Sequence, residues 1–287
     1  MSNRRHPKRD AAIDQLVLGG GGAPNGATAP GALSGPSLPQ AYTNRYEIKY
    51  LVAARDVARV RGALAGLLEP DANNGESGGY INHSIYFDTP NYRYYSEKHE
   101  GQLARIKPRL RFYRPAYGAP AKATFLELKG RYDRIVAKRR TGLDQGMAEA
   151  LLNGASPGAV FGDSRDAVAM EFAYLADRFN LQPATTVIYH REAFFSSLYK
   201  SLRITLDSRL QCSLATRPDT PPDSCVEGLP GGETVLEVKY NDQIPRILLS
   251  RFHALGLQQR TFSKYAVSLE RCFDQFRSRR LRASRTL

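Results

Sequence analysis

The stretch Arg109-Leu110-Arg111-Phe112-Tyr113-Arg114 alternates cationic and bulky side chains along the chain. A period of two is typical of a β-strand whose two faces meet different surroundings. The first two arginines share one face, and the leucine and the phenylalanine share the other. Because Pro108 has no N–H for a ladder, we expect the strand to begin at Arg109. Neighbouring guanidinium groups repel each other, so carboxylates or an anionic ligand should lie opposite this face.

The same alternation returns in four further stretches, residues 45–50, 125–129, 203–207 and 235–239. A sheet with one face in water also alternates in this way. The polar positions here, however, are nearly all long charged side chains, whereas a solvated face usually also carries Thr, Ser and Gln. A curved sheet with its charged face inward and helices packed on its apolar outside explains the pattern better. We therefore expect an α+β fold, an antiparallel β-barrel around a basic tunnel for a polyanion.

The composition favours anionic partners, because 41 Lys and Arg against 28 Asp and Glu leave a formal net charge of +13 over 287 residues. Such a charge suits nucleic acid, a membrane surface or phosphate compounds. Cys212, Cys225 and Cys272 form neither a CxxC pair nor a disulfide framework, which indicates a reducing compartment. We expect no transmembrane segment, since no apolar run is long enough, and residues 13–18 are too short and polar for a signal sequence. A cytoplasmic protein is the expectation.

The chain divides into a Gly- and Pro-rich N-terminal tail over residues 1–41 that we expect to be disordered, one domain over residues 42–276, and a basic C-terminal tail over residues 277–287. Apolar residues at helical spacing predict helices over residues 53–68, 144–152, 165–180, 245–255 and 263–276. Strands are expected over residues 42–52, 84–88, 109–114 (within the segment 105–114), 124–130, 185–195, 198–207 and 233–240. The tyrosines at 92, 94 and 95 are expected to pack in the fold rather than stack on bases.

A series of short motifs follows in a set order along residues 42–276. They are Glu47-Ile-Lys49-Tyr50, Ile85-Tyr-Phe-Asp88-Thr-Pro-Asn-Tyr92, Arg109-Leu-Arg111-Phe-Tyr113, Leu126-Glu-Leu-Lys129, Lys138-Arg-Arg140, Tyr189-His-Arg191-Glu-Ala-Phe194, Arg203-Ile-Thr-Leu-Asp207, Leu236-Glu237-Val-Lys239 and Phe262-Ser263-Lys264-Tyr265. Each motif is weak alone, but their joint order resembles the catalytic domain of the vacuolar transporter chaperone (VTC) family. That family comprises polyphosphate polymerases with the triphosphate-tunnel (CYTH-like) fold.

The resemblance implies roles for individual residues. The basic lining that would hold phosphates and act in catalysis is Lys49, Arg109, Arg111, Lys129, Lys138, Arg191, Arg203 and Lys264. Further substrate contacts are expected from Ser263, Arg140, Arg260 and Lys239. Glu237 matches the residue that binds the catalytic Mn²⁺ or Mg²⁺, and Glu47 could assist it.

The sequence departs from the family pattern at Thr261, where the polymerases usually have a lysine, although the adjacent Arg260 could substitute for it. It also has Arg45 where tunnel triphosphatases have the first glutamate of Glu-x-Glu-x-Lys. This second difference argues against the triphosphatase arrangement, in which several carboxylates hold the metal.

Phosphoryl transfer from ATP to a phosphate chain requires in-line positioning and charge neutralisation more than covalent help. The predicted function is therefore an ATP-dependent, polyphosphate polymerase-like phosphotransferase, with ATP and inorganic polyphosphate as partners. A metal-dependent tunnel triphosphatase and a non-catalytic domain that binds polyphosphate or a nucleotide both remain open. Specific nucleic-acid binding is not expected, because only charge and tyrosines support it. A protein partner is conceivable, but the sequence identifies none.

Overall fold

The structure is a computed structural model that describes residues 46–76, 78–132, 135–221, 224–241 and 243–283. All of these residues belong to one compact unit, residues 41–287. The predicted N-terminal tail and Arg45 lie outside the described residues.

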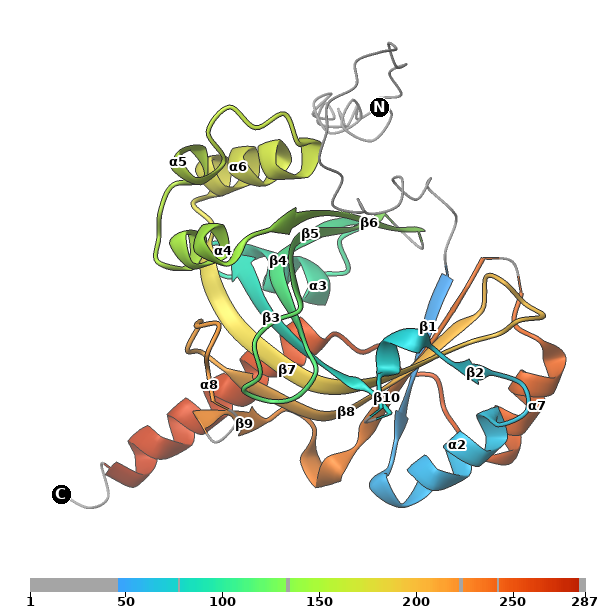
Figure 1. The fold of residues 1–287 in the computed structure, drawn as a ribbon. Helices are drawn as coiled ribbons and strands as arrows, with labels where there is room; N and C mark the ends of the chain where they lie inside the picture. Colours follow the sequence, from blue (N-terminus) through green and yellow to red (C-terminus); the bar gives the residue numbers. More distant parts are fainter. Residues whose placement is uncertain (1–45, 77, 133–134, 222–223, 242, 284–287) are drawn as a thin grey trace, which may run out of the picture. The chain divides into compact units, whose positions relative to one another are not determined.

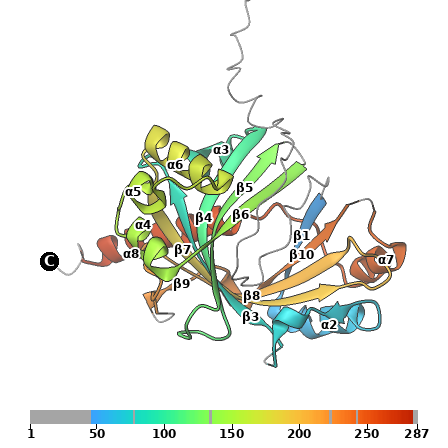
Figure 2. The same ribbon diagram turned by 45° about the horizontal axis from the view of Figure 1, so that its top comes forward.

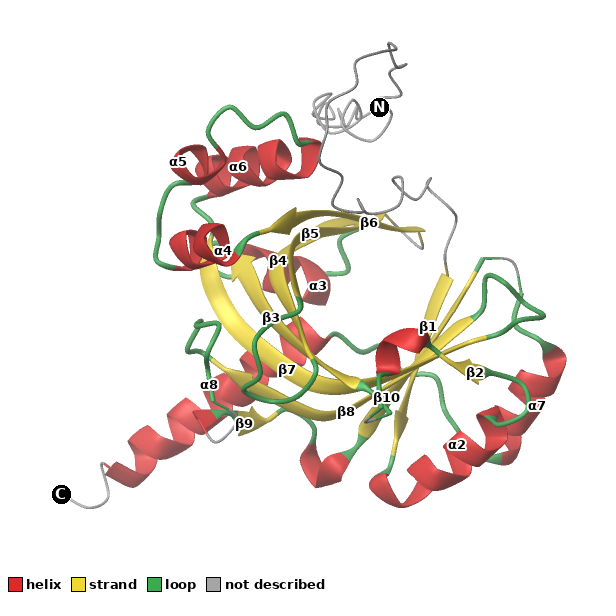
Figure 3. Cartoon of the chain, viewed as in Figure 1, coloured by secondary structure: helices red, strands yellow, loops and turns green. Residues whose placement is uncertain are grey.

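The described strands form one antiparallel sheet, and helices flank it, so the α+β prediction is confirmed (Figure 3). The order of the main strands is β1-β10-β8-β7-β3-β4-β5-β6, with β2 on β7 and β9 on β8. Their bounds are β1 (Tyr46–Val52), β2 (Glu69–Pro70), β3 (Tyr80–Asp88), β4 (Ala104–Arg114), β5 (Ala123–Tyr132), β6 (Ile135–Leu143), β7 (Gln182–Phe195), β8 (Arg203–Ser213), β9 (Val226–Glu227) and β10 (Thr234–Tyr240). The sheet curves strongly along β3, β7 and β8 (Figure 1).

The sheet is not closed into a barrel, and this part of the predicted fold is wrong. The end strands β1 and β6 have no ladder between them (Figure 2). A physical reason lies at the free edge of β1, where another segment takes the backbone groups. Tyr50 forms a bridge with Gln259, and the Arg260 N–H donates to the Lys49 carbonyl at 2.8 Å. Side chains still reach across, since Lys129 Nζ of β5 lies 3.3 Å from Glu47 Oε2 of β1.

Two groups of helices cover the apolar face of the sheet, as predicted. Over β1, β10 and β8 lie α2 (Val57–Leu64) and α7 (Arg246–Ala254), which bury Val60, Leu64, Leu248 and Phe252. Over β3, β4 and β5 lie α4 (Gln145–Leu152) and α6 (Ala167–Phe179), which bury residues such as Phe172. Burial of these apolar side chains stabilises both layers.

The last helix, α8 (Lys264–Ala283), lies on the opposite, charged face, which contradicts the prediction that helices pack only outside. Its Tyr265 and Leu269 pack in one cluster with Tyr86 of β3 and Tyr189 of β7. Tyr265 also donates a hydrogen bond to Asp88 at the end of β3. The start of α8 is therefore fixed against the charged face.

Strand β4 runs from Ala104 through Pro108, so the prediction that it begins at Arg109 is wrong. Pro108 pairs with Leu128 of β5, whereas β3 pairs with β4 only from Arg109 onward. At Pro108 the strand thus has a ladder neighbour on one side only, where proline is tolerated.

Other elements differ from the predictions in their bounds. The short helices α3 (Arg93–His99) and α5 (Pro157–Phe161) and the strand β6 were not predicted. The predicted helix over residues 53–68 is a 3₁₀ turn, η1 (Ala54–Asp56), followed by α2, which ends before Gly66, a residue with a positive φ of 75°. Helix α8 continues to Ala283, so much of the predicted basic tail from residue 277 onward is helical.

Candidate functional site

The charged side chains of β1, β10, β8, β7, β4, β5 and β6 meet on one face of the sheet. The cations whose contacts lie on this face include Lys49, Lys107, Arg109, Arg111, Lys129, Lys138, Arg191, Arg203, Lys239 and Lys264. The carboxylates among them are Glu47, Glu127, Asp207 and Glu237. The cations therefore outnumber the carboxylates, and the face as a whole suits an anion.

Glu237 of β10 is the most shared carboxylate of the charged face. Its Oε1 lies 2.7 Å from Lys264 Nζ and 3.6 Å from Lys49 Nζ. Its Oε2 lies 2.9 Å from Lys239 Nζ and 3.4 Å from Arg191 Nη2. Burial alone would raise the pKa of Glu237, but the surrounding cations hold it well below its usual range. Glu237 is therefore ionised at neutral pH.

Asp207 of β8 links two of the same cations to the sheet. Arg191 donates to its two oxygens, both at 2.6 Å, and Lys264 Nζ lies 2.5 Å from Oδ2. Asp207 is completely buried. Burial would raise its pKa, but Arg191 and Lys264 lower it. Such a bidentate pair fixes the plane of the guanidinium.

A second centre surrounds Glu127 of β5, which is also completely buried. Arg109 donates to its Oε2 through Nε at 2.8 Å and Nη2 at 2.7 Å, and Lys138 Nζ lies 2.5 Å from Oε1. Arg111 Nε is 3.6 Å away and donates to the Ser84 hydroxyl at 3.2 Å. Arg109 and Arg111 thus lie close to one shared carboxylate, which offsets their mutual repulsion.

The third centre lies at Glu47 of β1. Its Oε1 is 2.9 Å from Lys49 Nζ, and its Oε2 is 3.3 Å from Lys129 Nζ. Lys49 also donates to the Phe262 carbonyl at 3.0 Å, just before α8. Burial would raise the pKa of Glu47, but Lys129 and Lys49 hold it well below its usual range. This centre therefore ties β1, β5 and the segment before α8 together.

Two buried polar side chains on or beside this face lack a hydrogen-bond partner among the described residues: the Thr205 hydroxyl and the Asn82 amide. Thr205 stands directly opposite Glu237 in the β10–β8 ladder, and Asn82 stands opposite Tyr113 and Tyr189. Buried polar groups are nearly always hydrogen-bonded in native proteins.

The described residues contain no group of three or more His, Cys, Asp and Glu placed to hold a metal ion. The predicted ligands Glu47 and Glu237 offer hard carboxylate oxygens, which suit Mn²⁺ or Mg²⁺. Each of these oxygens, however, already lies near an ammonium or guanidinium group. These residues fit a metal that arrives with phosphate oxygens, as Mg²⁺ commonly does, better than one bound by protein alone.

The structure brings most predicted site residues into these three centres. Ser263 lies beside them as the residue preceding α8, and its Oγ accepts from Lys107 Nζ at 2.8 Å. Arg203 pairs instead with Asp71 at 2.6 Å, at the edge of the face. Arg140, exposed, lies over the ring of Phe125 at 4.4 Å. Arg260 is exposed and donates to Gln258 at 3.0 Å, so its side chain does not join the centres.

Sequence reasoning missed Lys107 and did not assign a site role to Asp207 or Glu127. Lys107 stands two residues before Arg109, so strand alternation alone would have placed it on the charged face. Starting the strand at Arg109 hid it. For Asp207 and Glu127, only the partners from neighbouring elements show how many cations each carboxylate serves.

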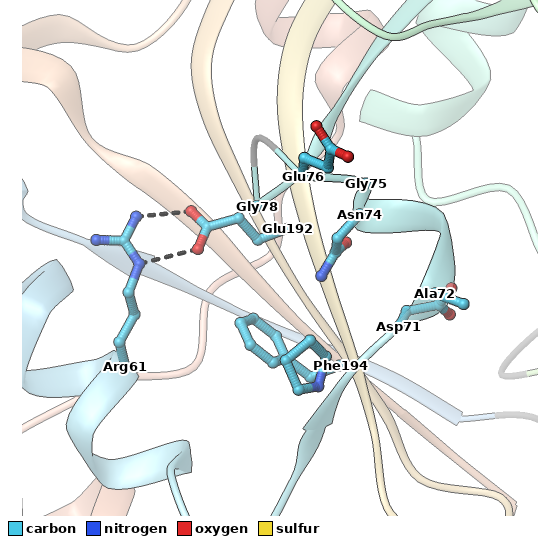
Figure 4. Close-up of a pocket in the computed structure, with 10 residues that line it drawn as sticks. Arg61, Asp71, Ala72, Asn74, Gly75, Glu76, Gly78, Glu192 and Phe194 are labelled. Carbon is cyan, nitrogen blue, oxygen red and sulfur yellow. Dashed lines mark hydrogen bonds and ion pairs between the residues drawn. The ribbon is translucent and has the colours of Figure 1, made fainter.

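A separate pocket of about 570 Å³ lies beside β7 and the 3₁₀ turn η2 (Ala72–Asn74) (Figure 4). Three of the charged residues that line it, Arg61, Glu192 and Asp71, are paired within the protein. Arg61 donates two hydrogen bonds to Glu192, at 2.9 and 2.6 Å, and Asp71 holds Arg203. The Asn74 side chain bonds to both backbone groups of Ala193. Asp71 of this pocket therefore fixes the side chain of Arg203 at the edge of the charged face.

None of the helices that the structure describes combines the length and the apolar character needed to cross a membrane.

Comparisons with known proteins match the chain to a family model and to distantly similar solved structures. The family model of the VTC domain matches residues 44–273. No curated protein matches the chain in sequence. Among solved structures, the PH1819 protein of Pyrococcus horikoshii OT3 is 16% identical, with 78% of this chain and 99% of that chain covered and a TM-score of 0.41. A Bacillus halodurans protein, provisionally described as an adenylate cyclase, is 14% identical, with 77% and 95% covered and a TM-score of 0.45.

Proposed function

The chain belongs to the VTC domain family, and from this premise we propose that it is a phosphotransferase that moves the terminal phosphate of ATP onto a polyphosphate chain. The observation that carries the proposal is the buried cluster in which Glu237 is shared by Lys49, Lys239, Lys264 and Arg191. Burying more cations than carboxylates costs free energy unless a bound anion balances the excess positive charge.

The basic side chains of the charged face would bind the triphosphate and the end of the acceptor chain. Arg109 and Arg111 are buried and held by Glu127, so their forks are oriented before substrate arrives. Arginine suits phosphate through two parallel hydrogen bonds, and lysine acts as a point charge. The Thr205 hydroxyl and the Asn82 amide could donate further hydrogen bonds to phosphate oxygens.

The reaction requires positioning and charge neutralisation. A terminal oxygen of the polyphosphate forms a bond to the γ-phosphorus of ATP, and the bond from that phosphorus to the β,γ-bridging oxygen breaks, which releases ADP. Because the acceptor oxygen is already anionic, no general base is needed. Lys264, Arg191 and Lys49 would hold the reacting phosphates in line. A divalent ion held by Glu237 and Glu47 together with phosphate oxygens would supply further neutralisation of the triphosphate.

Hydrolysis of a triphosphate is the second candidate, and one observation favours it. The charged face carries four buried or nearly buried carboxylates, Glu47, Glu127, Asp207 and Glu237, and several carboxylates are what the triphosphatase arrangement requires. All four are ion-paired to cations, which leaves phosphotransfer as the better-supported reaction. A non-catalytic domain that binds polyphosphate is the third candidate.

The deciding experiment is incubation of the purified protein with ATP and Mn²⁺ or Mg²⁺, with and without tripolyphosphate as a primer. Gel electrophoresis and phosphorus NMR would resolve the products. We expect long phosphate chains and ADP, with at least a ~100-fold lower rate in E237Q. E149Q removes an exposed carboxylate of α4 and serves as the matched control, with turnover unchanged. Release of orthophosphate without chains would establish hydrolysis, and tight tripolyphosphate binding without turnover would establish the binding domain.

A further inference from the structure

Lys107 of β4 differs from the other cations of the charged face in having no carboxylate partner. Among the described residues, no carboxylate oxygen lies within ion-pair distance of its Nζ. The contacts of this ammonium are the Ser263 hydroxyl at 2.8 Å and the ring of Tyr265, whose centroid is 5.8 Å away. It stands directly opposite Lys129 in the β4–β5 ladder. Like charges placed directly opposite destabilise a sheet, so this arrangement requires a compensating anion.

The charges that act most strongly on Lys107 are positive, and the Glu47 carboxylate of β1 is paired with two of these cations, Lys49 and Lys129. Lys129 faces it from β5, Lys49 from β1, Lys98 from α3 and Arg105 from its own strand. Its contacts at the start of α8 are neutral: Ser263, which precedes the helix, and Tyr265 within it. Burial is the largest cause that lowers the pKa of Lys107, to about 7, and these cations lower it further. In the free protein its ammonium group is therefore only partly protonated near neutral pH.

The hydroxyl of Ser263 is the polar group in direct contact with Lys107. Its Oγ accepts from Lys107 Nζ at 2.8 Å and from the Ala266 N–H at 3.4 Å. A hydroxyl has two acceptor positions and one donor. With both acceptor positions in use, the Ser263 proton is directed toward a further acceptor. The hydroxyl also lies at the N-terminus of α8, where backbone N–H groups and the helix dipole favour an anion.

We propose that Lys107 joins Ser263, Lys49 and Lys129 in binding a phosphate group at the start of α8, and that Lys107 takes up a proton when phosphate binds there. This subsite rests on the proposed function, because it deepens the same charged face. Lysine is suited to this role and arginine is not, since a guanidinium keeps its proton under all these conditions. Burial also lowers the pKa of Lys138 and of Lys239, each to about 8, so both contribute to the pH dependence of affinity for a phosphate chain. The contribution of Lys107 is the part of that dependence which K107R removes.

The sign of the dependence follows from the two states of Lys107. Below pH 7 it is already charged, so binding requires no proton and affinity is highest. Above pH 7 the free protein must first take up a proton, and affinity falls with rising pH until the pKa of the bound state is reached. With a free pKa of about 7, the charged fraction falls about tenfold between pH 6 and pH 8.

The test is isothermal titration of tripolyphosphate, without ATP or metal, into the wild type, K107R, K107M and K122M at pH 6 and pH 8. Circular dichroism and thermal unfolding would show that each variant folds. Lys122 is exposed and lies in the turn between β4 and β5, so K122M controls for the loss of one positive charge. We expect the ratio of wild-type to K107R affinity to fall about tenfold from pH 6 to pH 8. The proton equilibria of the ligand are common to both proteins and cancel in this ratio.

At pH 6, K107M should bind tripolyphosphate at least about tenfold more weakly than the wild type does. K122M should bind it as tightly as the wild type. Titrations at pH 8 in two buffers of different ionisation enthalpy should show more proton uptake for the wild type than for K107R. Equal pH dependence in the wild type and K107R, or equal affinity of K107M and K122M, would overturn the subsite. If the wild type itself does not bind tripolyphosphate, the proposed function fails instead.

Discussion

Replacing Asp207 with asparagine tests whether the charged face is held together by its carboxylates. Asp207 is completely buried and accepts two hydrogen bonds from Arg191 and an ion pair from Lys264. Asparagine keeps the shape of the side chain and removes the charge. The two cations are then left with Glu237 as their shared carboxylate. D207N therefore raises the net charge of the cluster by one in a site away from water.

The expected loss follows from the burial of the pair. Removing one partner of a buried ion pair costs ~3–5 kcal/mol. Because Glu237 still contacts both cations, we expect the lower end, about 3 kcal/mol. For a domain of this size, each kcal/mol shifts Tm by about 2–4 °C, so Tm should fall by ~6–12 °C.

Thermal unfolding followed by circular dichroism measures this change, with and without tripolyphosphate. D177N is the matched control, because Asp177 is exposed on α6 and its loss should move Tm by less than ~2 °C. Tripolyphosphate should raise the Tm of D207N at least as much as that of the wild type, since the cluster has gained a positive charge. A Tm within ~2 °C of the wild type would refute the claim that Asp207 stabilises the cluster. Loss of the ligand-induced rise would show that Asp207 takes part in ligand binding itself.

Two further predictions concern residues on either side of the sheet. Burial, assisted by Arg114, lowers the pKa of His83 to about 3. Because the unfolded chain takes up a proton below about pH 6.5 and the folded protein does not, the free energy of unfolding should fall by ~2–3 kcal/mol between pH 6.5 and pH 4.5. Urea unfolding of H83Q should lack this part of the decline, and an identical decline in H83Q would exclude His83 as its source. Lys138 pairs with Glu127 on the charged face, whereas its neighbour Arg139 pairs with Glu171 of α6, with Arg139 Nη2 2.6 Å from Glu171 Oε1. K138M should therefore lower the turnover of ATP about tenfold or more, whereas R139M should leave turnover unchanged and lower the free energy of unfolding in urea by ~1 kcal/mol or less. Equal effects of the two changes on turnover would contradict this assignment of faces.

The sequence predicted the two faces of the sheet well, because strand alternation is a local property. Glu47, Arg109, Lys129 and Glu237 all lie on the face to which their spacing assigned them. Element bounds were less predictable where composition misled. The first residues of β3 include Asn82 and His83, which are polar yet buried, and the basic residues of β6 hid a strand. Neither segment has the apolar run that identifies a strand from sequence.

Closure of the sheet and the place of α8 could not be predicted, since both depend on contacts between distant segments. The apolar spacing of residues 264–276 shows that the helix buries one side, but not which face of the sheet it covers. Only the packing of Tyr265 against Tyr86 places it on the charged face. Similarly, nothing local to residues 46–52 indicates that Gln259 and Arg260 occupy the free edge of β1 and leave the barrel open.

The partners of the cations divide them into two kinds, and this division bears on how the site works. Lys49, Lys264 and Arg191 each contact a carboxylate, so they remain charged and in place whether or not a phosphate is bound. Their positions are fixed before substrate arrives, which is the condition for electrostatic catalysis without reorganisation. Lys107 has like charges around it instead, so its proton depends on the ligand. If every cation were paired with a carboxylate, the attraction of the charged face for phosphate would be cancelled. If the face had no carboxylates, repulsion between its buried cations would destabilise the fold. Fixed pairs around Glu237 and Asp207, together with Lys107 of β4, which has no carboxylate partner among the described residues, satisfy both requirements.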